Sequence, residues 1–478
     1  MTMELTITLL DPDFGSPNSL YAKRIMVLSL FGSSASVNSR LTDHAAIHRS
    51  YLIQEAPVTS EVLILNKRAV VLGADSAVTT SGGEHPRYSK SANKIFEISG
   101  NGRIAAAIYG NANIDLVPWE LVLKLFRIHL GAATFNTVKE YSGALVAFLS
   151  GNDQLFPPAL RASWVEQQFD TALKLVLEEA TRSSPNVTEN SVPLEDRAER
   201  WAIEAARIRA LLDPSAISHT LSQALDDVLS NIGPWVTRAQ DQLDSVPELA
   251  AVNAADLAEL GHKLRYVLPK WILGNTGLVI AGYGEEQIFP AYEQLEVYGH
   301  IGDEFCYKST KSFEVTHTGH AEIQPLAQTS MIDMFTDGFG TSLERIIDRQ
   351  GKAAFEKVLS ALAVNGITVP SALADSITQQ CHSDFMMEWK RENWKQNFHP
   401  LIGVLQNLSV GEMAHLAESL LGLESLKERV TSASESVGGP IDVAVITKSE
   451  GLIWIKRKHY FDAKLNMRYA MRLEHSLE

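Results

Sequence analysis

The fold of this chain is decided by the stretch Thr59-Ser60-Glu61-Val62-Leu63-Ile64-Leu65-Asn66-Lys67-Arg68-Ala69-Val70-Val71-Leu72-Gly73-Ala74-Asp75. Two apolar runs, 61–65 and 69–74, flank the polar segment 66–68. Apolar runs of this length around a short polar turn are typical of a β-hairpin. The stretch therefore predicts two adjacent antiparallel strands.

A second hairpin and two helices are predicted directly after this stretch. The apolar runs 95–98 and 104–109 flank a turn that contains Asn101-Gly102, and Asn-Gly is a strong hairpin signal. Helical patterns then cover 118–130 and 137–149. Strands followed by helices favour an α+β fold.

The opening stretch also carries residues suited to nucleophilic chemistry. A threonine hydroxyl becomes a good nucleophile when a base takes its proton, and the α-amino group of the same threonine can be that base if the threonine is residue one. A free α-amine titrates at about 7.7 to 8.0, close to the pH that suits a general base. The reaction also needs a cation, a carboxylate that orients it and a backbone N–H for the oxyanion. Lys94, Asp75 and the segment 107–110 are the candidates.

In these residues the chain resembles the proteasome β-type and HslV-like N-terminal nucleophile hydrolases. Thr59 and Asp75 have the separation that the family uses between its N-terminal threonine and its first catalytic aspartate, and Lys94-Ile95-Phe96-Glu97-Ile98 matches the segment that opens with its catalytic lysine. The resemblance implies that Thr59 is the nucleophile with its free α-amine as base. It implies that Asp75 and Lys94 are the charged partners and that Gly110, in 103–112, is the oxyanion-hole glycine.

Two later segments resemble the same family. Residues 278–284 resemble its inner strand, and 436–447 resemble its Ser-Gly-Gly element with the strand that follows. Ser436 is a candidate supporting residue there, with Ser434 as the alternative. The resemblance implies a four-layer αββα sandwich with two large α-helical insertions.

The patterns divide the chain into four parts. Residues 1–58 form an N-terminal extension, and the hydrolase core combines 59–150, 271–325 and 430–478. Helix-rich sequence, broken by caps and prolines, predicts a first insertion over 151–270 and a second over 326–429.

The N-terminus of the active chain is the main departure from the family. Val58 precedes Thr59 and differs from the glycine at which the family cuts its propeptides. One hypothesis is that translation starts at a GTG codon read here as Val58, so that removal of methionine exposes Thr59. The other is a true propeptide removed by autolysis between Val58 and Thr59.

Composition limits the classes of function and location. The net charge of −15 disfavours a general nucleic-acid binder, and two cysteines, Cys306 and Cys381, favour a reducing cytoplasm over a disulfide framework. Nothing reaches the length of a membrane-spanning helix, and the short apolar run 25–31 lies well inside the chain for a signal peptide. His317 and His320 have metal-ligand spacing, but a surface or core role is favoured, so no metal or cofactor is predicted.

Two classes of function follow. The first is a threonine-type hydrolase of peptide or amide bonds, with a peptide or protein substrate. The resemblance implies self-association, and because no nucleotide-binding loop is present, any unfolding ATPase would be a separate protein. The second is a catalytically inactive scaffold or binding protein of the same fold.

Overall fold

A computed structural model describes residues 59–80, 87–89, 91–210, 219–267, 276–319, 321–328, 330–367, 369–431, 438–459 and 466–467. The predicted N-terminal extension 1–58 and the candidates Ser434, Ser436 and His320 lie outside these residues.

The first of two five-stranded sheets contains the hairpin predicted from the opening stretch. Its strand order is β12-β1-β2-β13-β14, and every neighbouring pair is antiparallel. The turn at 66–68 joins β1 to β2, as the apolar and polar pattern predicts. The strands are β1 (Ser60–Leu65), β2 (Val70–Ala74), β12 (Glu322–Ala327), β13 (Asp442–Thr447) and β14 (Gly451–Lys456).

The second sheet has the order β11-β10-β9-β6-β5 and is also antiparallel. It contains the second predicted hairpin, whose turn includes Asn101-Gly102. The strands are β5 (Ile95–Glu97), β6 (Ile104–Gly110), β9 (Thr276–Gly282), β10 (Ala291–Ile301) and β11 (Glu304–Glu314). Two short hairpins, β3 (Val78–Thr80) with β4 (Arg87–Ser89) and β7 (Asn113–Ile114) with β8 (Val117–Pro118), accompany the sheets.

The side chains of these strands alternate between two packing environments. On β1, Leu63 and Leu65 join a buried cluster that also holds Val279 and Ala281 of the second sheet. Val62 and Ile64 join a different cluster with residues of α14 (Val410–Thr431). This alternation is the period of two expected for a strand with both faces covered. One face of β1 therefore points to the second sheet and the other to a helix.

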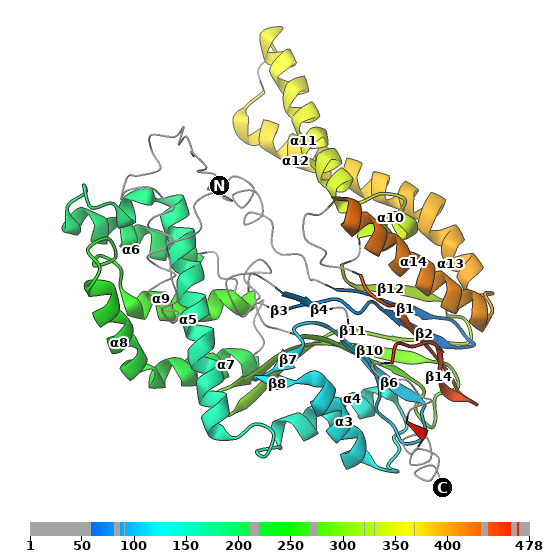
Figure 1. Cartoon of the computed structure of the whole chain (residues 1–478). Helices are drawn as coiled ribbons and strands as arrows, with labels where there is room; N and C mark the ends of the chain where they lie inside the picture. The colour runs from blue at the N-terminus through cyan, green and yellow to red at the C-terminus, as the bar shows by residue number, and fades with distance from the viewer. Residues whose placement is uncertain are drawn as a thin grey trace, which may run out of the picture.

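The outer face of the second sheet is covered by α3 (Trp119–Leu130) and α4 (Val138–Ser150), which share a buried cluster with β5, β6, β9 and β10. Thr137 caps α4 with a complete capping box, a motif that fixes a helix start. Figure 1 shows α3 and α4 at one side of the sheets and α14 at the other. The expected mixture of helices with antiparallel sheets is confirmed.

A helical segment follows α4 and returns to the second sheet at β9. It consists of α5 (Pro158–Ser183), η2 (Pro185–Thr188), α6 (Leu194–Ala210), α7 (His219–Asn231), α8 (Gly233–Asp244) and α9 (Ala254–Val267). These helices have their own buried cluster, which includes Tyr298 and Ile301 of β10 and Cys306 of β11.

A second helical segment lies between β12 and β13. It consists of α10 (Ser330–Asp337), α11 (Thr341–Val364), α12 (Ser371–Asn393), the π-helical turn η5 (Trp394–Phe398), α13 (His399–Leu405) and α14. Helices α11 and α12 form a hairpin that projects away from the sheets (Figure 1), and α11 has no buried residue. Helix α14 instead packs on β1, β2 and β13. No helix among the described residues has the length and apolar character required to cross a membrane.

Candidate active site

Thr59 and Glu61 lie on the face of β1 that points to the second sheet. Glu61 is directly opposite Leu326 of β12 and Ala74 of β2, and both of those residues belong to the cluster between the sheets. Thr59 immediately precedes β1, two positions from Glu61, so it projects to the same side. The Thr59 hydroxyl donates a hydrogen bond to Glu61 Oε2 at 3.2 Å. Both side chains are buried, with exposed fractions of 3% and 1%.

Lys94 lies between two carboxylates in this buried space. Its Nζ forms an ion pair with Glu61 Oε1 at 3.2 Å and a shorter one with Asp75 Oδ1. The lysine directly precedes β5, and its carbonyl accepts a hydrogen bond from the Ile108 N–H of β6. The structure thus brings Thr59, Asp75 and Lys94 together through Glu61.

Asp75 is held by backbone donors as well as by Lys94. It directly follows β2, and its carboxylate accepts hydrogen bonds from the N–H groups of Ser60, Ala77 and Gly438 at 3.1, 3.4 and 2.8 Å. The Asp75 N–H donates in turn to the carbonyl of Ser60 at 3.1 Å. These hydrogen bonds and the ion pair with Lys94 fix the position of the Asp75 carboxyl group in the site.

Burial raises the pKa of Glu61 from 4.5 to about 7. The Lys94 ammonium opposes this rise, the neighbouring negative charge of Asp75 adds to it, and hydrogen bonds from Lys94 and Thr59 lower the pKa again. The site holds one ammonium against two carboxyl groups, so Lys94 cannot compensate both charges fully. Near neutral pH, Glu61 therefore exchanges a proton readily, which suits a general acid or base.

The end of β12 fixes the backbone of Thr59. The Gln328 N–H donates to the Thr59 carbonyl at 2.9 Å, and the Ser60 hydroxyl donates to the Gln328 carbonyl at 3.2 Å. The Gln328 side chain donates to Glu428 of α14 at 3.0 Å. Ala327, just before it, has a positive φ of 62°, a conformation that costs energy for a residue with a Cβ. This turn pins the nucleophile candidate to the first sheet.

Gly110 ends β6 with a φ of 82°, in the region that favours glycine, and is exposed. Its neighbour Tyr109 has a pKa raised to about 12, first by burial; the hydrogen bond from Gln294 opposes the rise, and the negative charges of Glu296 and Glu61 add to it. The electrostatic effect of Glu61 on Tyr109 links the end of β6 to the site. The oxyanion role of Gly110 and the supporting role of Ser436 stay predictions.

Glu61 is the site residue that the sequence interpretation missed. The signal was present, because residues i and i+2 of a strand project to the same side, and a glutamate two positions after the candidate threonine directly precedes the apolar residues 62–65. A strand with both faces covered has no inexpensive place for a carboxylate. Glu61 should have stood out for that reason.

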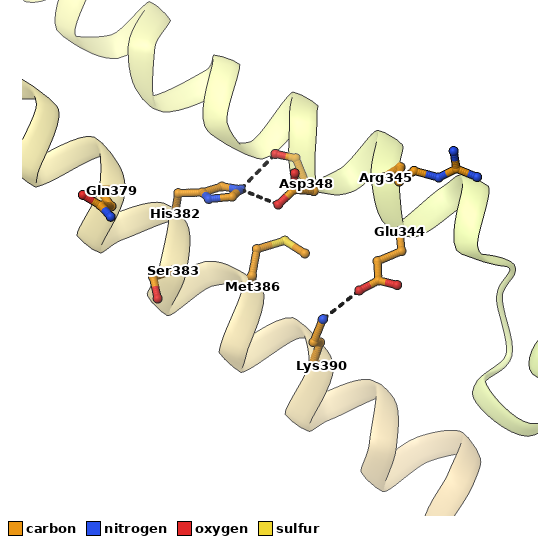
Figure 2. Close-up of a pocket in the computed structure, with 8 residues that line it drawn as sticks. All are labelled: Glu344, Arg345, Asp348, Gln379, His382, Ser383, Met386 and Lys390. Atoms are coloured by element: carbon orange, nitrogen blue, oxygen red, sulfur yellow. Dashed lines mark hydrogen bonds and ion pairs between the residues drawn. The ribbon is translucent and has the colours of Figure 1, made fainter. Parts of the chain in front are cut away.

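The described chain also has an open polar groove, between α11 and α12. Figure 2 shows His382 of α12 turned toward Asp348 of α11, and Lys390 toward Glu344. The His382 to Asp348 pair is 3.3 Å long, and the Lys390 to Glu344 pair is 2.7 Å long. These groups join the two helices to each other, so the groove is best explained as the seam of the hairpin. Among the described residues no cluster of three metal-ligating side chains occurs.

No family model matches the sequence, and no curated protein matches it. Among solved structures, the Anbu complex from Pseudomonas aeruginosa, determined as a helical assembly, is 9% identical, with 87% of this chain and 95% of that chain covered and a TM-score of 0.28. A Gly-1 mutant of Anbu from Hyphomicrobium sp. strain MC1 is 12% identical, with 87% and 96% covered and a TM-score of 0.26.

Proposed function

We propose that this chain is a threonine-type hydrolase of amide bonds, with the Thr59 hydroxyl as nucleophile. The observation that carries the proposal is the buried line of contacts from Thr59 through Glu61 and Lys94 to Asp75. A nucleophile needs a proton acceptor within hydrogen-bond distance and a cation that stabilises developing negative charge. Both are present within one cluster between the sheets.

The packing supports the four-layer αββα interpretation of the fold. One buried cluster joins the facing sides of the two sheets, a second joins the second sheet to α3 and α4, and a third joins the first sheet to α14. Three interfaces in this order agree with a helix layer, two sheets and a second helix layer. The candidate site then lies in the central interface, which strands of both sheets line.

The proposed reaction has two chemical steps. The Thr59 oxygen attacks the amide carbonyl carbon, the C–N bond breaks, and an ester of the acyl group on Thr59 forms. Water then hydrolyses that ester and restores the hydroxyl. Lys94, held by Asp75, stabilises the oxygen as it loses its proton, and the N–H of Gly110 is the proposed donor to the oxyanion. In the mature chain the free α-amine of Thr59 is the base that the family resemblance implies.

The test is covalent labelling of Thr59. A β-lactone acylates an activated hydroxyl when its ring C–O bond opens, and mass spectrometry of peptides identifies the acylated residue. We expect labelling of Thr59 that is lost in Thr59→Ala and retained in Thr59→Ser. Ser60→Ala is the matched control, because that hydroxyl donates to a carbonyl at the neighbouring position. The inactive scaffold is the alternative, and an unlabelled chain whose sequenced N-terminus is Thr59 would establish it.

The origin of the N-terminus is tested on protein made from the native gene. A downstream start and an autolytic propeptide both predict a mature chain that begins at Thr59. They differ in Thr59→Ala, which lengthens the mature chain only if the bond is cut by the protein itself. A peptide substrate, self-association, a separate ATPase and a cytoplasmic location remain part of this proposal.

A further inference from the structure

Glu61 is a second buried carboxyl group beside Lys94, whose positive charge is already paired with Asp75. Its two oxygens contact different groups, since Oε2 accepts the Thr59 hydroxyl at 3.2 Å and Oε1 faces Lys94 Nζ at 3.2 Å. Lys94 also has the closer carboxylate of Asp75. A second buried carboxylate is therefore unnecessary for holding the lysine.

We propose that Glu61 is a catalytic residue that takes the proton of the Thr59 hydroxyl, the role that the family resemblance gives to the α-amine. This inference rests on the proposed function and deepens it, because it assigns the proton transfer to an atom already in contact with the nucleophile. A candidate base must lie within hydrogen-bond reach of the proton that it takes. Glu61 Oε2 accepts the Thr59 hydroxyl at 3.2 Å and so meets that geometric requirement.

Each step balances with Glu61 in this role. As the Thr59 oxygen bonds to the amide carbon, its proton moves to Glu61 Oε2 and the carbonyl electrons move to the oxyanion. Collapse of the tetrahedral intermediate breaks the C–N bond, and Glu61 returns the proton to the leaving nitrogen. In the second step water attacks the ester, gives a proton to Glu61, and the Thr59 oxygen leaves and receives that proton.

The charges around Glu61 fit a base that works near neutral pH. The titratable groups that act on it are Lys94 and Asp75 from the end of β2, and Glu61 in turn acts on Tyr109 of β6. Asp75 is a less suitable acceptor, because three backbone N–H groups and Lys94 already occupy its oxygens. The raised pKa of Glu61, about 7, agrees with a carboxylate that can both take and return a proton.

The experiment measures the rate of β-lactone labelling at Thr59 from pH 5.5 to 9 in protein whose sequenced N-terminus is Thr59. The variants are Glu61→Gln, which keeps the shape and loses the base, and Glu61→Asp, which keeps a carboxylate. Glu293→Gln is the matched control, because Glu293 is a buried carboxylate of β10 bonded to Ser309. Thermal melts of every variant show whether the chain is folded.

For the wild type we expect a labelling rate that rises with pH around a midpoint near the Glu61 pKa of about 7. Glu61→Gln should be slower by roughly 10²- to 10⁴-fold at pH 8 and should lose the pH step. Its deficit should therefore be about 30-fold smaller at pH 5.5, because a group with a pKa of about 7 is mostly protonated there. Glu61→Asp should keep the step at a reduced rate, and Glu293→Gln should match the wild type. A purely structural role of Glu61 would instead lower the rate equally at every pH.

The outcomes separate this inference from the proposed function. If Thr59 is labelled and folded Glu61→Gln keeps the wild-type rate and pH step, Glu61 is not the base and the hydrolase proposal stands. If the folded wild type is not labelled at Thr59 at any pH, both proposals fail.

Discussion

Replacing Glu61 by glutamine should stabilise the folded protein at pH 8 and have little effect at pH 5. Glutamine has the shape of a protonated glutamate, so the substitution removes the charge without opening a cavity. Burial makes the ionised form of Glu61 costly, and this cost exceeds the attraction of Lys94, since the net effect is a pKa raised from 4.5 to about 7. The glutamine variant avoids that cost.

The size of the effect follows from the pKa. A raised pKa means that the folded state binds the proton more tightly than the unfolded state does, so stability falls as the pH rises from about 4.5 to 7 and the loss is complete above 7. At about 1.4 kcal/mol per pH unit, the ionised carboxylate costs about 3 kcal/mol at pH 8 and less than about 1 kcal/mol at pH 5. Glu61→Gln should recover these amounts.

The assay compares urea midpoints at the two pH values by tryptophan fluorescence. Glu61→Gln should unfold at a higher urea concentration than the wild type at pH 8, with a much smaller difference at pH 5. Glu293→Gln is the control for loss of a buried carboxylate elsewhere in the fold. A Glu61→Gln variant that is less stable than the wild type at pH 8 would refute the reasoning, because the ion pair with Lys94 would then outweigh the burial cost.

Three further predictions concern stability. Lys94→Met leaves two buried carboxyl groups without their cation and should cost about 3 to 5 kcal/mol, with a lower melting temperature that partly recovers at pH 5. In Gly277→Ala the new Cβ would lie 1.9 Å from the Tyr109 ring, so the free energy of unfolding should fall by about 1 to 3 kcal/mol and the melting temperature should fall with it. Gly143→Ala is the control, because Gly143 lies inside α4 with no atom within 4 Å of the new Cβ, and it should raise the free energy of unfolding by roughly 0.5 to 1 kcal/mol. Equal effects of the two substitutions on the melting temperature would contradict the packing. Lys390 and Glu344 form an ion pair across the groove between α11 and α12, with side chains that are 57% and 34% exposed. Their coupling energy in a double-mutant cycle should be about 0.5 kcal/mol or less. A coupling energy above about 2 kcal/mol would contradict a surface contact between the two helices.

Local sequence predicted the parts of the fold that local interactions specify. The hairpins at 61–74 and 95–109 have apolar runs with clear turns, and both are present. The capping box at Thr137 starts α4. The adjacency of Lys94 and Asp75 came from the family resemblance, because nothing within the hairpins themselves brings 75 and 94 together.

The remaining parts depend on contacts between distant segments. The long β10 and β11 hairpin was missed: β11 is an edge strand with a largely exposed, polar pattern, which is typical of a protected sheet edge and gives little strand signal. The packing of α14 on β1 was missed because its apolar residues do not show which surface they cover. The local sequence placed Glu61 on the same side of the strand as Thr59, but its ion pair with Lys94 joins two different sheets and depends on the tertiary fold.

The energetics of the site bear on the choice between a hydrolase and an inactive scaffold. Replacing a buried ion pair by apolar side chains of similar volume is often neutral or stabilising. The neighbours of this site include Leu63, Leu72 and Ile95. Apolar side chains in place of the three charged ones would therefore suit these surroundings chemically. A scaffold would need only the packing of the two sheets, which a costly carboxylate at Glu61 weakens. A hydrolase needs a hydroxyl, a proton acceptor and a cation in contact, and that requirement explains why three ionisable groups are concentrated beside one threonine in an otherwise apolar interface. The cost in stability is therefore an argument for chemistry at Thr59.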